Sequence, residues 1–256
     1  MKYFLYYMAL IKRMKDYINS DDSDFKIFKL KYTDLEIKCI NSFNISKSET
    51  YNHMGNKNNM ENITTFLNKI GTNDKDNINI LGKTIIKILD NVLSAFDIDH
   101  FWITIRVSLP TDYFNIPRWH KDGRFFFNSK SQKSPKFITV LKGPGTLLIK
   151  STKKVNKIYN DISQKITDEF TKLKNITIND NNKIYDKYRL IFSEALKNVK
   201  IIQLTNNECV ICHPELTQDA GAIHSEPKMD TPRLFISILP GSKKDILELK
   251  KRWNIK

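Results

Sequence analysis

The chain has 256 residues, of which 40% are hydrophobic and 11% aromatic, so it can bury a sizeable core and fold as one domain without disulfide or metal staples. No apolar run approaches the roughly 20 residues of a membrane helix, and the three cysteines (Cys39, Cys209 and Cys212) do not make a disulfide framework. We therefore expect a soluble cytoplasmic protein without a secretory signal or a membrane partner.

The formal net charge of +14 raises nucleic acid as a partner, but the type of basic residue weakens that inference. Only seven of the 42 basic residues are arginine, and lysine occurs together with many Asn and Ile residues. This bias is typical of AT-rich genomes, such as those of some giant viruses and protists. Lysines spread along a chain usually form a solvated surface, so we attribute the charge to genome bias and expect a viral or protist protein.

Residues 1–100 predict helices, strands and one Asn-rich loop. Apolar residues at three- and four-residue spacings predict an amphipathic helix over 3–18, and alternation of apolar and polar residues predicts one or two strands over 25–40. Residues 52–80 include nine asparagines, which favours a mobile surface loop. An apolar stripe over 81–96 predicts a helix that packs on a sheet.

From residue 101 onward, short apolar segments alternate with turn residues. They predict strands at Phe101–Leu109, Arg118–Phe127, Pro135–Lys142, Thr146–Lys150, Ile201–Leu204, Glu208–His213 and Arg233–Leu239. Such spacing favours a β-sandwich or barrel. Helical spacing breaks the pattern in 158–173 and 184–199, so we interpret 151–200 as a helical insertion that serves as a lid.

These elements predict a single α+β domain over residues 1–256. Its core would be formed by 101–150 and 201–242, with 1–100 packed on that core.

One ordered set of residues carries chemistry. His120 and Asp122 lie two apart in a predicted strand, where alternate side chains share a face. A second histidine, His224, follows about a hundred residues later, and Arg233 begins the last predicted strand. Two histidines and one carboxylate on one side of a metal leave three positions open, as a non-haem iron requires to bind a co-substrate and dioxygen together.

This set, taken in its order along the chain, resembles the Fe(II)/2-oxoglutarate-dependent dioxygenase superfamily over approximately residues 101–240. The resemblance implies a double-stranded β-helix core, a jelly-roll and cupin-like fold. It implies that His120, Asp122 and His224 are the catalytic iron ligands and that Arg233 holds the distal carboxylate of the co-substrate 2-oxoglutarate. A planar guanidinium suits that role because it binds a carboxylate through two hydrogen bonds.

The chain departs from the family pattern in one position next to this arginine. Many members carry Ser or Thr two residues after it, whereas this chain has Phe235. Ser237 lies four residues after the arginine on the same predicted strand face, and we expect it to take part in co-substrate binding. The helical insertion accounts for the long separation of the two histidines.

The implied reaction is oxidative decarboxylation of 2-oxoglutarate to succinate, coupled to hydroxylation of a carbon–hydrogen bond or to demethylation at nitrogen. The superfamily modifies proteins, nucleic acids and small molecules, so the sequence leaves the substrate open. Two alternatives remain. One is a non-catalytic basic β-barrel that binds nucleic acid, and the other is a cupin-type metalloenzyme that does not use 2-oxoglutarate.

Other residues have plainer interpretations. Trp119, Phe125 and Phe127 are expected in the core or the pocket wall. Arg106 and Arg124 either contact a ligand or form surface ion pairs. A Cys-x-x-Cys-His sequence at 209–213 matches a c-type haem attachment motif, but it lies in an apolar strand of a chain without a secretory signal, so we expect no haem. A zinc site would need a second pair of ligands there.

Overall fold

The computed structural model describes residues 2–20, 24–126, 134–172, 178–215, 217 and 220–254. Nine strands are described: β1 Phe25–Lys29, β2 Glu49–Asn56, β3 His100–Ser108, β4 Lys136–Lys142, β5 Leu147–Ile149, β6 Ile201–Gln203, β7 Glu208–Cys212, β8 Ile223–Ser225 and β9 Arg233–Gly241. The described helices are α1 Lys2–Ile18, α2 Asp34–Ser42, α3 Ile63–Asn68, α4 Lys75–Phe96, α5 Lys153–Lys172, α6 Ile178–Leu196 and α7 Lys243–Arg252, with short 3-10 turns η1 Lys57–Asn59 and η2 Asp112–Phe114. None of these helices is long and apolar enough to cross a bilayer.

The strands form a six-stranded sheet of order β1-β7-β4-β9-β3-β2 and a three-stranded sheet of order β6-β5-β8. These pairings are nested along the sequence. The outermost pair is β3 with β9; inside it His120 bridges His224 of β8, then β4 pairs with β7, and the innermost pair is β5 with β6. All four pairings are antiparallel, and successive pairs alternate between the two sheets. A chain folded back on itself in this way is a double-stranded β-helix, so the predicted α+β jelly-roll class is confirmed.

One face of the large sheet carries the main hydrophobic core. In β9 the side chains of Leu234, Ile236 and Ile238 are buried against this core, because alternate residues of a strand point to the same face. The other face of the sheet is thereby left to Arg233, Phe235 and Ser237, which line a cavity. The period of two that builds the core therefore also builds the site.

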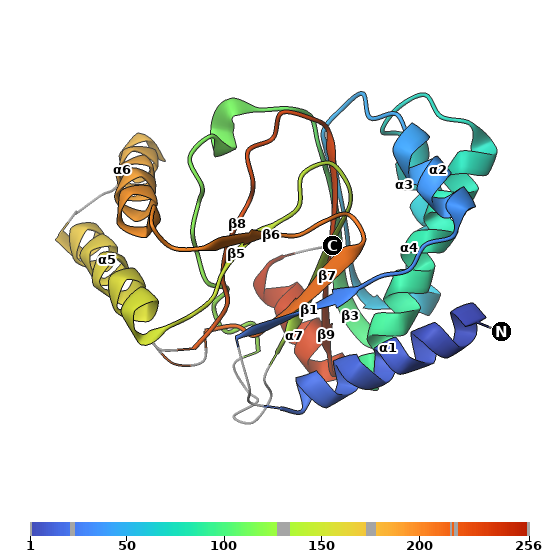
Figure 1. The fold of residues 1–256 in the computed structure, drawn as a ribbon, viewed down its shortest axis with the longest axis horizontal. Coiled ribbons are helices and arrows are strands. Elements are labelled where there is room, and N and C mark those ends of the chain that lie inside the picture. The colour runs from blue at the N-terminus through green and yellow to red at the C-terminus, as the bar shows by residue number, and fades with distance from the viewer. Residues whose placement is uncertain are drawn as a thin grey trace.

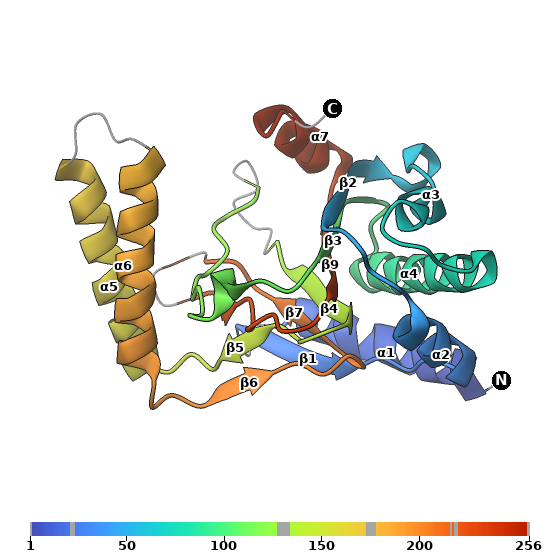
Figure 2. The ribbon, with the colours of Figure 1, turned by 90° about the horizontal axis from the view of Figure 1, so that it is seen from above.

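Helices α1 to α4 cover the apolar face of the large sheet (Figures 1 and 2). Helix α4 has a continuous buried stripe that includes Leu81, Ile85, Leu89 and Val92, and it contacts β9. Each such aliphatic side chain contributes roughly 1.5 to 3 kcal/mol on full burial. The predicted helices over 3–18 and 81–96 are confirmed by α1 and α4.

The inserted helices α5 and α6 lie on the opposite side of the molecule, beyond the small sheet (Figure 2). They pack on each other through Tyr159 and Phe192, and their shared apolar cluster takes in Trp119, Ile149 and Ile223. The prediction of two helices in this interval is confirmed. No described residue of the pair lines the cavity between the sheets, and the predicted role as a lid stays a prediction.

Two expectations for the first hundred residues differ from the structure, the first of them only in part. The strand pattern over 25–40 is realised only in β1, because Thr33 and Glu36 form a capping box that begins helix α2. The Asn-rich interval 52–80 is not a loop, since it contains the end of β2, then α3 and the start of α4. Asparagine serves there as a cap: the side chain of Asn62 accepts the backbone N–H of Thr64 at the start of α3.

The predicted strand over 118–127 also differs from the structure. Within the described residues 118–126 the only β pairing is the bridge between His120 and His224. Phe127 lies outside the described residues. Sequence patterns gave no sign of two further elements, the short strand β8 and the C-terminal helix α7.

Candidate metal centre

Backbone pairing brings the two distant histidines side by side. The N–H of His120 donates to the carbonyl of His224 at 3.0 Å, and the N–H of His224 donates back to the carbonyl of His120 at 2.9 Å. Residues paired in this way across antiparallel strands project their side chains to the same side. The imidazole centroids are accordingly 4.2 Å apart.

Each imidazole has its tautomer fixed by a backbone carbonyl. The Nδ1 of His120 is 2.8 Å from the carbonyl oxygen of Arg118, and the Nδ1 of His224 is 2.9 Å from that of Ala222. A carbonyl oxygen can only accept, so both Nδ1 atoms carry the proton. The Nε2 lone pairs are therefore left for a ligand, as in metal sites where the second ring nitrogen is held by a hydrogen bond.

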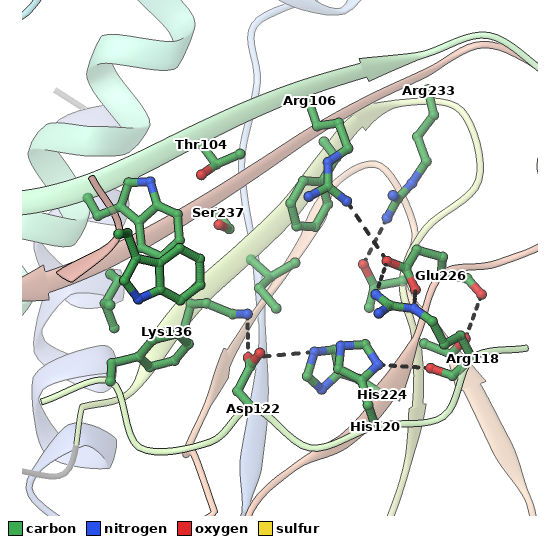
Figure 3. A pocket seen from close by; sticks show the side chains of 18 residues that line it. Thr104, Arg106, Arg118, His120, Asp122, Lys136, His224, Glu226, Arg233 and Ser237 are labelled. Carbon is green, nitrogen blue, oxygen red and sulfur yellow. Dashed lines mark hydrogen bonds and ion pairs between the residues drawn. The ribbon is translucent and has the colours of Figure 1, made fainter. Parts of the chain in front are cut away.

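Asp122 completes the group from the next position on the same side. Its Oδ2 lies 3.6 Å from Nε2 of His224, and one donor atom from each of the three residues lies within 4.8 Å of the others. The same carboxylate forms an ion pair with Nζ of Lys136, at the start of β4. Figure 3 shows the lysine and the imidazoles on either side of this carboxylate.

The protonation states suit a cation. Burial lowers the pKa of both histidines, and the proximity of His224 lowers that of His120 further, so both rings are neutral at pH 7. Burial alone would raise the pKa of Asp122, but His224 and Lys136 outweigh it and hold this pKa at about 2. Two neutral imidazoles and one carboxylate can therefore accept a metal without first losing protons.

A buried guanidinium opens onto the same cavity. Arg233 is 3% exposed, its Nε donates to the carbonyl of Pro144 at 2.9 Å, and its Nη2 donates to Oγ1 of Thr146 at 3.0 Å. Burial lowers the pKa of Arg233 to about 10. Among the described residues no carboxylate lies within ion-pair distance of Arg233, and no acceptor is bonded to its Nη1.

Glu226 attracts this cation only from beyond ion-pair distance, so the buried guanidinium has no direct counter-ion among the described residues and favours a bound anion. The two protein acceptors, Pro144 and Thr146, fix the plane of the Arg233 guanidinium and leave Nη1 for a further partner. The cation is thus oriented before any ligand arrives.

Glu226 organises the rim beside this arginine. Its carboxylate accepts two hydrogen bonds from Arg118, at 2.8 and 3.3 Å, and lies 3.9 Å from Nη1 of Arg106. Burial would raise the pKa of Glu226, but the bonds from Arg118 keep it below its usual range. This pair ties the segment that carries His120 to the segment that carries His224.

The cavity between the sheets has a volume of about 340 Å³. It is lined by the three candidate ligands, by Arg233 and Ser237 from β9, by Arg106 from β3, and by Lys136, and Figure 3 shows these side chains facing one another. A cavity of this size accommodates a small dicarboxylate beside a metal ion.

The His120–Asp122 segment is also held from behind, by the inserted helices. The backbone N–H of Lys121 donates to the hydroxyl of Tyr159 on α5 at 2.9 Å. The fully buried ammonium of Lys121 lies 4.9 Å from the centroid of the Tyr159 ring and 3.7 Å from a carboxylate oxygen of Glu215. The residue between the two candidate ligands is thus an anchor.

The structure brings together all five predicted site residues, His120, Asp122, His224, Arg233 and Ser237. Their roles stay proposals. Phe125 lines the cavity and Trp119 lies in the apolar cluster, as expected, and Arg106 reaches the cavity while Arg124 is exposed outside it.

Sequence reasoning missed Lys136, Glu226 and Tyr159. The sequence carries no local signal for Lys136 or Tyr159, because each reaches the site through pairing across the fold. Glu226 follows His224 by two residues and was open to the same period-two argument that linked His120 to Asp122.

Of the comparisons with known proteins, only the one with solved structures finds proteins similar to this chain. No family model matches the sequence, and no curated protein sequence matches it. The similar solved structures include a prolyl-4-hydroxylase from Pseudomonas putida, with 7% identity, 91% of this chain and 99% of that chain covered, and a TM-score of 0.42.

Two further similar structures are known. A prolyl hydroxylase from Trichoplax adhaerens has 7% identity, covers 96% of this chain and 94% of that chain, and has a TM-score of 0.41. A rice dioxygenase for auxin oxidation has 8% identity, covers 91% of this chain and 78% of that chain, and has a TM-score of 0.42.

Proposed function

We propose that this protein is an Fe(II)- and 2-oxoglutarate-dependent oxygenase. One observation carries the proposal: a buried guanidinium without a carboxylate partner among the described residues faces the same cavity as a group of two histidines and one carboxylate. The metal-ligand group alone would suit several divalent metals. The oriented arginine adds the demand for a small anion next to that metal.

The residues fit an iron ion and the keto acid. His120 and His224 would bind iron through Nε2, since their Nδ1 atoms are held by backbone carbonyls, and Asp122 would bind through a carboxylate oxygen. Arg233 would receive the distal carboxylate of 2-oxoglutarate, and Ser237 on the same strand face lines the same cavity. When bound, iron and 2-oxoglutarate together supply the oxidising chemistry that inserts oxygen into a substrate bond.

The remaining cavity residues position the cationic side chains and shield them from water. Glu226 fixes Arg118 and the rim through two hydrogen bonds. Phe235 places its ring 4.8 Å from the Arg233 guanidinium, which keeps water from one face of that cation. The protein thus orients one anion and excludes solvent, and the substrate approaches from the part of the cavity that the keto acid leaves open.

Anaerobic titration tests this function. Purified protein with Fe(II) should show a weak visible charge-transfer band on addition of 2-oxoglutarate, because the keto acid must chelate protein-bound iron to give it. His224→Ala should abolish the band, whereas Arg124→Ala, at an exposed arginine outside the cavity, should leave it unchanged. Tight metal binding with no band at saturating 2-oxoglutarate would indicate a cupin-type metalloenzyme instead. Absence of metal binding would overturn the enzyme proposal.

A further inference from the structure

The end of the cavity away from Arg233 is aromatic. Trp102 on β3 stands edge-on to Trp253, just after α7, with ring centroids 5.1 Å apart, and Phe125 lies 6.5 Å from Trp102. We call these three residues the aromatic mouth. Trp253 is 51% exposed although it lines the cavity. Exposed indoles at a cavity entrance offer flat faces for stacking.

Hydrogen bonds hold Trp102 and Phe125 of the aromatic mouth in place. The indole N–H of Trp102 donates to Oδ1 of Asn52 at 3.2 Å, and the hydroxyl of Thr104 donates to the same oxygen at 2.7 Å. A guanidinium nitrogen of Arg252 donates to the carbonyl of Phe125. The ring faces are therefore oriented before a ligand binds, which reduces the entropy cost of binding.

The charge of the cavity selects the kind of ligand. Its lining carries four cations (Arg106, Arg118, Lys136 and Arg233) and two carboxylates (Asp122 and Glu226). Iron and 2-oxoglutarate cancel each other in formal charge, so the loaded site keeps its excess of positive charge. Lys136 lies 5.6 Å from the centroid of the Phe125 ring and would repel a cation seated in the aromatic mouth. The mouth therefore suits a flat ring that belongs to an anion.

A second cationic feature adjoins the mouth. The last turn of α7 is basic, with Lys250, Lys251 and Arg252, and the next residue is Trp253. Lys251 is exposed and Lys250 is half-buried. Helix α7 packs against β2, β3 and β9, so it is fixed relative to the cavity. Basic residues next in the chain to an exposed aromatic ring suit the phosphates and bases of a single strand.

We propose that this face binds single-stranded nucleic acid, with a base in the aromatic mouth and the adjoining phosphates on Lys250 and Lys251. The role of this nucleic acid as the substrate of the oxygenase rests on the proposed function. Binding itself needs neither iron nor 2-oxoglutarate. A base seated between Trp102 and Lys136 would lie next to Asp122, with which Lys136 forms its ion pair.

Binding is measured by fluorescence anisotropy of a labelled ten-residue oligothymidylate with the full-length, metal-free protein over a salt series. We expect Trp253→Ala to weaken binding about tenfold, because base stacking on one ring is lost. Lys250→Gln with Lys251→Gln should weaken binding and reduce the salt slope by about 0.7 for each lost phosphate contact.

The matched control is Lys243→Gln with Lys244→Gln, which removes the same charge from two exposed lysines at the other end of α7. This control should lower the affinity less and keep the salt slope. Equal effects of the two pairs, or no effect of Trp253→Ala, would show that only net charge acts and would overturn the proposal. Polyglutamate of the same length should bind at least tenfold more weakly than the oligonucleotide, and thymidine monophosphate should bind with lower affinity than the oligonucleotide. If either binds as tightly as the oligonucleotide, the proposal of strand binding is wrong.

His120→Ala separates this inference from the proposed function. This variant should lose metal binding and keep full oligonucleotide affinity, because His120 lies outside the aromatic mouth. A protein that binds the strand but gives no iron-keto acid band would refute the oxygenase and keep the docking surface. A protein that gives the band but ignores the strand would do the reverse.

Discussion

The hydroxyl of Tyr159 accepts the backbone N–H of Lys121, the residue that separates His120 from Asp122, at 2.9 Å in a buried position. An inserted helix thus holds the backbone between two candidate metal ligands. The insertion therefore has a positioning role, whether or not it also covers the cavity.

Tyr159→Phe should remove this acceptor and leave the N–H of Lys121 buried without it. We expect the free energy of unfolding to fall by about 1 to 3 kcal/mol, and the Kd for Fe(II) to rise roughly tenfold because the ligands are less well held. Calorimetric titration under anaerobic conditions measures both metal affinity and stoichiometry. Tyr188→Phe is the matched control, since its hydroxyl bonds only within the helical pair. Equal metal affinity in wild type and Tyr159→Phe would show that the bond serves stability alone.

Asp122→Ala should abolish tight iron binding, because it removes the only anionic member of the ligand group. The ammonium of Lys136 would then lose its ion-pair partner and remain as an unpaired positive charge next to the imidazoles. Metal content after dialysis measures this loss, and Glu194→Gln is the control, at an exposed carboxylate outside the ligand group. Retention of stoichiometric iron by Asp122→Ala would remove Asp122 from the site.

Arg233→Ala should raise the apparent KM for 2-oxoglutarate by about two orders of magnitude, since two charge-assisted bonds on the order of 1.5 to 3 kcal/mol each are lost. Fe(II) affinity without the keto acid should stay nearly constant. Arg233→Lys should recover part of the effect, because an ammonium keeps the charge and loses the planar fork. Succinate formation and iron titration on the same proteins decide the matter. An unchanged KM would mean that Arg106 binds the carboxylate instead, or that 2-oxoglutarate is not a co-substrate.

Glu36 gives a pH-dependent contribution to stability far from the site. Burial would raise the pKa of Glu36, but the hydrogen bonds from Lys87 and from the Thr33 backbone lower it below 4.5. A lowered folded-state pKa stabilises the fold above the unfolded pKa, and this contribution is lost as pH falls through the folded pKa. Glu36→Gln should therefore cost on the order of 1.5 to 3 kcal/mol at pH 7 and progressively less below pH 4.5. Urea unfolding at pH 7 and pH 3 measures the difference, and a constant deficit would contradict it.

The site was largely predictable from sequence because its residues follow local rules. His120 and Asp122 are two apart, and Arg233 and Ser237 are four apart on one strand, so the period of two places each pair on one face. Asp122 lies beside both histidines even though its segment forms only one bridge in the described residues. The geometry was carried by a single hydrogen-bonded pair instead of a regular strand.

Long-range partners and caps were not predictable in the same way. Lys136 meets Asp122 because β4 lies between β7 and β9, an order that no local pattern reveals. Asparagine was treated as a mark of disorder over 52–80, whereas Asn56 and Asn62 cap short helical turns there. The Thr33–Glu36 capping box was readable and was overridden by an apparent alternation of apolar residues.

The nested pairing of strands has a consequence for the way the protein matures. His120 and Asp122 leave the ribosome early, but their bridging partner His224 and the strand of Arg233 emerge about a hundred residues later. A nascent chain therefore carries two candidate ligands that cannot meet the third until residue 224 has been synthesised. Under the proposed function, iron could be held only after residue 224 has been synthesised, and a chain that stops before His224 would lack the third candidate ligand.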